Sequence, residues 1–167
     1  MNYDDFLRCW QEADKKWSSY QNDVEHIVTE CHTYFCNKLL HDVKKREKYL
    51  SMFLPGERNI DKILKESYKP SAEYIEFGDD GWHNIGFILL FKSDKIMHIK
   101  SYFCFTIAVK RKSIDDLNTW IIKIREGGEE HLISIAPKQN ELEEIWKDFE
   151  KIFTYSVSQI SNGNNLN

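Results

Sequence analysis

The first 54 residues predict two amphipathic helices, because their apolar residues recur every three or four positions. The first helix covers residues 3–17, begins at the N-cap Asn2, and has the apolar stripe Tyr3, Phe6, Leu7, Trp10, Ala13 and Trp17. A serine pair then weakens the helical pattern. Asn22 and Glu25 resemble a capping box, which predicts a second helix running to about Leu54.

Proline residues mark the end of this helical part. Pro55 stops the second helix, whose length leaves a break near residues 42–46 as an alternative. Asn59 is placed to cap a short third helix, and Pro70 forces the chain before it to become extended. We therefore expect the helical part of the protein to occupy residues 1–68.

From Ala72 to Val109 the hydrophobic period changes to two, which predicts three strands of an antiparallel β-meander. The apolar odd positions are Ile75, Phe77, Ile85, Phe87, Leu89, Phe91, Met97, Ile99, Phe103, Phe105, Ile107 and Val109. Odd residues face each other only across loops with an odd number of residues, which predicts three-residue loops at 79–81 and 93–95. Gly81 suits the last loop position, whereas Lys95 does not, so a five-residue loop is the alternative there.

The C-terminal part predicts a helix, a strand and a second, longer helix. Ser113 and Asp116 form a capping box for a helix at 114–126, residues 131–136 form a fourth strand, and the last helix covers 139–160. Residues 161–167 are a polar tail. The even face of the sheet is also partly apolar, so we expect the N-terminal helices on one side of the sheet and the later helices on the other.

These elements predict an α+β fold in the order ααα-βββ-α-β-α, with the sheet and its inserted helix in residues 72–136. Residues 1–167 are expected to form a single domain, since the length suits one core and no linker is visible.

Charge and composition narrow the classes of partner. The net charge of −4 and the pI near 5.9 do not favour nucleic acid, which attracts basic surfaces. No apolar run approaches the ~20 residues of a membrane span, and the start lacks the features of an export signal. We therefore predict a cytoplasmic protein whose four cysteines are reduced thiols.

Chemical motifs are weak throughout the chain. His32 and Cys36 lie four residues apart and share a helix face, as paired metal ligands do, but no third ligand is marked. The chain has no glycine-rich phosphate loop and no nucleophile motif. The sequence accordingly predicts no metal, no cofactor and no catalytic residues.

An acidic, aromatic-rich chain without catalytic motifs favours a non-enzymatic protein-binding module. Its general character is that of an inhibitor or immunity-type protein that neutralises a basic partner protein, because acidic rims attract basic surfaces. The predicted binding residues lie at the first turn of the meander: Glu76, Asp79, Asp80, Trp82 and His83.

Two other functions remain open. The first is a small enzyme or ligand-binding domain with a pocket between the sheet and the N-terminal helices, lined by Tyr74, His98 and Tyr102. The second is a self-assembling protein in which the second helix pairs with its copy along Leu39, Val43 and Leu50.

Overall fold

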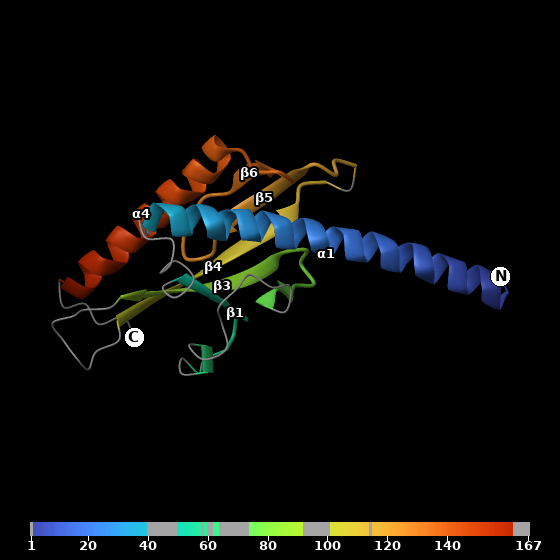
Figure 1. The fold of residues 1–167 in the computed structure, drawn as a ribbon, viewed down its shortest axis with the longest axis horizontal. Coiled ribbons are helices and arrows are strands. Elements are labelled where there is room, and N and C mark those ends of the chain that lie inside the picture. Colours follow the sequence, from blue (N-terminus) through green and yellow to red (C-terminus); the bar gives the residue numbers. More distant parts are fainter. Residues whose placement is uncertain are drawn as a thin grey trace.

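The computed structural model describes residues 2–39, 50–57, 59, 62–63, 74–91, 101–113 and 115–161. Within these ranges it contains two long helices and a six-stranded antiparallel sheet, which confirms the predicted α+β class. Figure 1 shows the N-terminal helix crossing the sheet and extending well past it.

Helix α1 is a single helix of 37 residues, Tyr3–Leu39. The predicted N-cap is confirmed, because Asn2 Oδ1 accepts the Asp5 N–H at 2.9 Å and Asp5 Oδ2 accepts the Asn2 N–H at 3.1 Å. The predicted break after Trp17 and the new start at Asn22 are wrong. The apolar stripe keeps its phase across this segment, and serine lowers helix stability by only a few tenths of a kcal/mol per residue, so the helix continues.

The second predicted helix also ends differently, because Leu50–Phe53 is strand β1. Leu50 and Met52 are buried in the core, whereas the Phe53 ring lies on the other face against Gly86 of the neighbouring strand. A Cβ atom at Gly86 would come within 2.6 Å of that ring, so the packing needs glycine there. A short apolar segment is compatible with both the helical and the strand period, so its pattern does not decide between them. Here pairing with the sheet makes the segment a strand.

Only part of the predicted third helix is described. Lys62 and Ile63 are helical, and the Lys62 N–H is donated to Asn59 Oδ1 at 3.1 Å, as expected for a cap. The alternative break at 42–46 and the extended segment predicted before Pro70 lie outside the described residues.

The remaining strands are β2 (Glu76–Phe77), β3 (His83–Phe91), β4 (Ser101–Arg111), β5 (Thr119–Ile124) and β6 (His131–Ser134). The sheet order is β1-β3-β4-β5-β6, and β2 also pairs with β3. Strands β3 to β6 thus form a meander whose neighbours in sequence are neighbours in space, with the shorter β1 and β2 on the outer edge of β3.

The odd residues do face each other, but only one of the two predicted loop positions agrees with the register. Phe77 pairs with His83 around the predicted loop 79–81, and Gly81 has the left-handed φ of 78° that such a loop requires. A loop at 93–95 would pair Phe91 with Met97, whereas Phe91 pairs with Ser101. A shift by four residues preserves the alternation of faces, so hydrophobic pattern alone could not detect it.

The helix predicted at 114–126 is wrong, because Thr119–Ile124 is strand β5. The Asp116 carboxylate accepts the N–H groups of Asn118 and Thr119, both at 3.1 Å, and so shapes a turn in place of a helix start. Trp120, Ile122 and Ile124 are buried alternately along the strand. Trp120 and Ile124, four residues apart, also fit a helical stripe, and the free edge of β4 selects the extended form.

Helices α1 and α4 (Gln139–Ser161) pack against the same face of the sheet, not on opposite faces as expected. The ring of Phe35 in α1 lies 6.0 Å from that of Phe105 in β4 and 5.2 Å from that of Trp146 in α4. The C-terminal helix itself is confirmed within one residue of its predicted end. Both apolar stripes and the odd face of the sheet therefore share one core.

Candidate functional site

The predicted acidic end is only partly assembled. Glu76, Asp79 and Asp80 are exposed on the β2–β3 hairpin, where the Asp80 Oδ1 accepts the Trp82 N–H at 3.0 Å. Asp80 Oδ2 also lies 3.8 Å from Arg125 Nη2, a basic neighbour that sequence reasoning did not foresee. The hairpin therefore exposes three carboxylates to solvent, and Arg125 partly offsets the charge of Asp80.

Trp82 and His83 do not join this surface, because they point to opposite faces of the sheet and both are buried. Three cations cover the ring of Trp82, at distances from its centroid of 4.3 Å for Lys110 Nζ, 4.4 Å for Lys123 Nζ and 5.3 Å for Arg125 Cζ. Neither ring can therefore serve as an exposed aromatic anchor for a partner.

His83 belongs to the core side of the sheet. Its Nε2 is hydrogen-bonded to the Tyr20 hydroxyl at 2.6 Å, and its ring centroid lies 4.7 Å from that of Phe77. Burial lowers the pKa of His83, against a smaller opposing effect of Asp80, so the neutral form is favoured. This residue fixes α1 to the sheet.

The residues of the alternative pocket are likewise separated. Tyr74 packs against the core, Tyr102 lies on the opposite face of the sheet and is 48% exposed, and His98 lies outside the described residues. Because α1 covers the odd face, Tyr102 cannot line a space between that helix and the sheet.

A shallow open hollow of about 450 Å³ lies between β4, the β5–β6 turn and α4. Its polar groups are already engaged, since Glu126 accepts the Thr106 N–H and Lys151 pairs with Asp148. Burial raises the pKa of Cys104 in its wall to about 11, so the thiol is not an activated nucleophile.

The buried carboxylate of Asp148 has the arrangement of an acid–base pair, yet it works as an anchor. Its Oδ2 receives hydrogen bonds from His131 Nε2 at 2.7 Å and from the Glu129 N–H at 2.8 Å, and its Oδ1 lies 3.1 Å from Lys151 Nζ. These contacts tie α4 to the start of β6. In the described part of the chain, no group of three His, Cys, Asp or Glu side chains could hold a metal ion.

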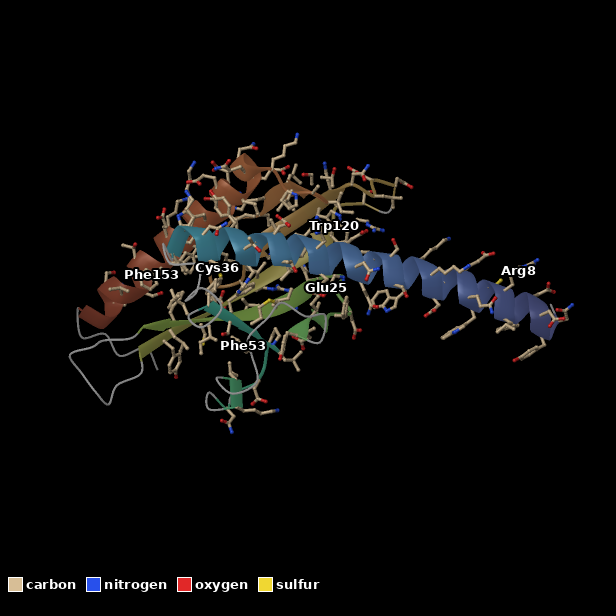
Figure 2. The ribbon with its side chains drawn as sticks, in the orientation of Figure 1. Arg8, Glu25, Cys36, Phe53, Trp120 and Phe153 are labelled. Atoms are coloured by element: carbon tan, nitrogen blue, oxygen red, sulfur yellow. The ribbon has the colours of Figure 1, made fainter. Side chains whose placement is uncertain are left out.

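The most unusual surface is the N-terminal part of α1, residues 3–19, which we call the arm. Every residue from 6 to 19 is exposed. The exposed fractions of its large apolar side chains are 78% for Tyr3, 67% for Phe6, 41% for Leu7, 72% for Trp10 and 44% for Trp17. Figure 2 shows Arg8 on this part of the helix, far from the labelled core residues Trp120 and Phe153.

The apolar side chains of the arm lie on one side of the helix. Tyr3, Phe6, Trp10, Ala13 and Trp17, which we call the arm stripe, follow one another by alternating steps of three and four residues. The same steps continue through Tyr20, Val24 and Ile27, and the last two are fully buried against the sheet. One stripe therefore begins in solvent and ends in the core.

Contacts at Trp17 and Tyr20 hold the base of the arm. The Trp17 ring lies 5.2 Å from the ring of Phe77, and Tyr20 contacts Trp120 at 5.1 Å between centroids. Asp23 Oδ2 accepts a hydrogen bond from Arg111 Nη2 at 3.2 Å. The direction in which the arm leaves the sheet is thus set by packing and an ion pair.

Sequence reasoning found the residues of the arm stripe but placed their helix against one side of the sheet. The signal that could have identified them is the unbroken phase between Trp17 and Tyr20. That phase makes residues 3–39 one straight helix of roughly 55 Å at ~1.5 Å per residue, which is longer than a domain of this size can cover.

The chain matches no family model, no curated protein and no solved structure. Within the described ranges, no helix combines the length and the apolar character needed to cross a membrane. The function must therefore be inferred from the surfaces of the chain itself.

Proposed function

We propose that this protein acts by binding another protein chain, without catalysing a reaction, and that the arm stripe is its contact surface. The observation that carries the proposal is the exposure of Tyr3, Phe6 and Trp10 on a helix whose later turns are packed. Contiguous apolar patches of this kind mark sites of association, and Trp and Tyr are the residues enriched in binding hot spots.

The energetics of the helix support the same reading. Most helical stability in proteins comes from packing of an apolar face, and intrinsic helix propensity contributes little. The arm has its cap at Asn2 but no packing over most of its length. A protein surface laid along the stripe would supply that packing.

The described acid–base groups support a binding role over an enzymatic one. The pair of His131 and Asp148 joins β6 to α4, and the hydroxyl of Tyr34 donates to Glu143 between α1 and α4. Each pair links two elements of the fold. A cytoplasmic location is part of this proposal, in which the four cysteines stay reduced thiols.

An inhibitor or immunity-type role toward a basic partner is a second proposal, and the exposure of Glu76 and Asp79 favours it. A basic partner would be attracted to this hairpin, and its affinity would fall at high salt. Replacing Glu76 and Asp79 by Gln and Asn should then weaken binding, while leaving the arm stripe unaffected.

The test of the main proposal is affinity capture by the tagged chain, followed by mass spectrometry of the intact complex. Phe6→Ser should lose the bound protein, whereas Tyr155→Ser should retain it. The two side chains are equally exposed, at 67% and 66%, so the pair separates a specific surface from general hydrophobicity. Equal capture by both variants would contradict a role for the arm.

A further inference from the structure

The arm stripe has a feature that points to one occupant. Its residues continue the stripe that packs on the sheet, and the boundary falls at Tyr20, where the contacts with His83 and Trp120 begin. The alternating steps of three and four residues are those of a two-stranded coiled coil. The open part of the stripe has the spacing of a helix–helix interface, and the described residues supply no helix to cover it.

We infer that the missing helix is the arm of a second copy of this chain, running antiparallel; this rests on the proposed function. In the register that joins the two stripes, Tyr3 lies opposite Tyr20 of the second copy. Phe6 then lies opposite its Trp17, and Trp10 lies opposite its Ala13. The same surface of each copy forms the two sides of the interface, and the copies are related by a two-fold axis. The assembly therefore closes at two copies.

The position of the sheet excludes a parallel pair. The sheet covers the stripe side of α1 from Tyr20 onward, so a parallel second helix would run into Phe77 and Trp120. In an antiparallel pair the second helix ends at its own Tyr3, opposite Tyr20, where this cover begins. Its own sheet then lies beyond the tip at Tyr3, where Figure 1 shows nothing but the end of the arm.

The length and the area of the stripe suit this pairing. Residues 3–20 of each copy overlap over roughly 25 Å at ~1.5 Å per residue. Burying the exposed apolar side chains of both arms removes on the order of 1,000 Å² from water, given ~150–250 Å² for each aromatic ring. That area reaches the lower limit expected of a specific interface.

Side-chain sizes alternate as the register requires. Trp10 is the largest residue at the centre of the arm stripe, and Ala13 is the smallest. The antiparallel register places each tryptophan over an alanine in both central layers, so large and small residues interdigitate. Had the two tryptophans met, the helices would be forced apart.

The charges beside the stripe do not oppose the pair. Asp14 and Lys16 are the only charged residues at its flanking positions. In the antiparallel register Asp14 lies beside Leu7 of the second copy, and Lys16 lies beside its Cys9. No like charges meet.

A lipid surface is a poorer occupant. Helices that lie on membranes usually have a polar face rich in lysine and arginine. The polar side of the arm instead carries four acidic residues against three basic ones: Asp4, Asp5, Glu12, Asp14, Arg8, Lys15 and Lys16. This balance favours a protein helix.

The first test is the mass of the full-length purified chain by sedimentation velocity over a range of concentrations. We expect a reversible dimer, and we expect Phe6→Ser and Ala13→Trp each to raise its dissociation constant by about tenfold or more. Combining Ala13→Trp with Trp10→Ala should restore most of the affinity, because the large residue and the small residue then exchange places. Tyr155→Ser is the matched control and should not alter the mass.

The direction of the pair is tested by oxidising the Lys16→Cys variant and mapping the disulfides of the covalent dimer. An antiparallel pair links Cys9 to the introduced thiol at position 16 of the second copy. In a parallel pair Cys9 and position 16 of the second copy are offset by roughly 10 Å along the axis at ~1.5 Å per residue, so this disulfide would not form, and its absence from the covalent dimer would overturn the inference.

The outcomes separate this inference from the proposed function. A chain that stays monomeric at all concentrations, or a dimer whose mass the arm variants leave unchanged, overturns self-pairing. If the monomer still captures a different protein and Phe6→Ser abolishes that capture, the proposed function stands without self-pairing. If the arm variants change neither mass nor capture, both are wrong.

Discussion

The two halves of α1 have the same pattern of apolar residues but opposite environments. Phe6 and Trp10 in the arm are 67% and 72% exposed, whereas Ile27 and Phe35 in the packed half are completely buried. The helix continues between them without a break. Periodicity therefore shows which side of a helix seeks a partner, and it does not show where that partner comes from.

The difference follows from the reach of the sheet. Strands β3 and β4, with α4, cover α1 from Tyr20 to its end at Leu39, so the packed half gains its stability within the chain. The arm lies beyond the edge of the sheet (Figure 1). Among the described residues, none buries the apolar side chains of the arm.

The largest effect is expected in the packed half. Phe35→Ala removes a ring that lies within 5.3 Å of the rings of Trp146 and Phe149, and it should lower the free energy of unfolding by about 3–5 kcal/mol. Urea unfolding followed by circular dichroism measures this loss. Phe35→Leu is a milder variant in case the alanine chain does not fold, and it should cost about half as much or less. A loss below about 1 kcal/mol for the alanine variant would contradict its place in the core.

The next largest effect is expected at Asp148, the buried carboxylate that ties α4 to the start of β6. Asp148→Asn should lower the free energy of unfolding at neutral pH by about 1–3 kcal/mol, because the charged hydrogen bonds from His131 and Lys151 are lost. The exposed Glu150 on the same helix provides the control Glu150→Gln, which should change little.

This prediction also has a definite pH dependence. Burial alone would raise the pKa of Asp148, but hydrogen bonds from His131, Glu129 and Lys151 outweigh it, so the pKa of the folded state is lowered. The stabilisation is complete above the unfolded pKa of about 4 and is lost as the pH falls through the folded pKa. The difference between the wild type and Asp148→Asn should shrink over that acid range, and a difference that grows there would be inconsistent with a charged anchor.

A smaller effect is expected at the boundary between the two halves. Tyr20→Phe removes the hydrogen bond to His83 Nε2 and should lower the free energy of unfolding by about 0.5–1.5 kcal/mol. The exposed ring of Tyr155 provides the control Tyr155→Phe, measured in the same urea titration. Equal stability of the two variants would show that the hydroxyl of Tyr20 does not hold the base of the arm.

The smallest effect is expected in the arm. Phe6→Ser should change the free energy of unfolding by less than about 0.5 kcal/mol in dilute solution, because no packing within the chain is lost. At high concentration the wild type should become more stable than this variant, since binding to the folded state adds to stability by mass action. A large loss in dilute solution would place Phe6 in contact with its own chain.

Much of the fold could be predicted in segments whose spacing of apolar residues suits either a helix or a strand but not both. The stripe of α4, the alternation in β3 and β4, and the glycine of the 79–81 loop each had one interpretation, and the structure agrees with them. Thr119–Ile124 and Leu50–Phe53 fit both periods, because short apolar segments rich in β-branched or large residues suit either form. There the free edges of β4 and β3 determined the outcome.

The candidate site was less predictable than the fold. Trp82 carried the signature of an exposed aromatic anchor, yet Lys110, Lys123 and Arg125 reach its ring from three neighbouring segments. Trp10 carried the signature of a core residue and is exposed. Exposure depends on what lies opposite a side chain, and that information comes from residues distant in sequence.

The sequence by itself determined the helical and strand faces, the cap at Asn2 and the tight hairpin at Gly81, because these depend on neighbouring residues and on local backbone sterics. The tertiary structure alone decided two features. Both helices pack on one face of the sheet, and the apolar stripe of α1 before Trp17 extends past the sheet. Those features depend on the lengths and positions of elements that come into contact only in the folded chain. Whether a side chain is buried is decided by such contacts.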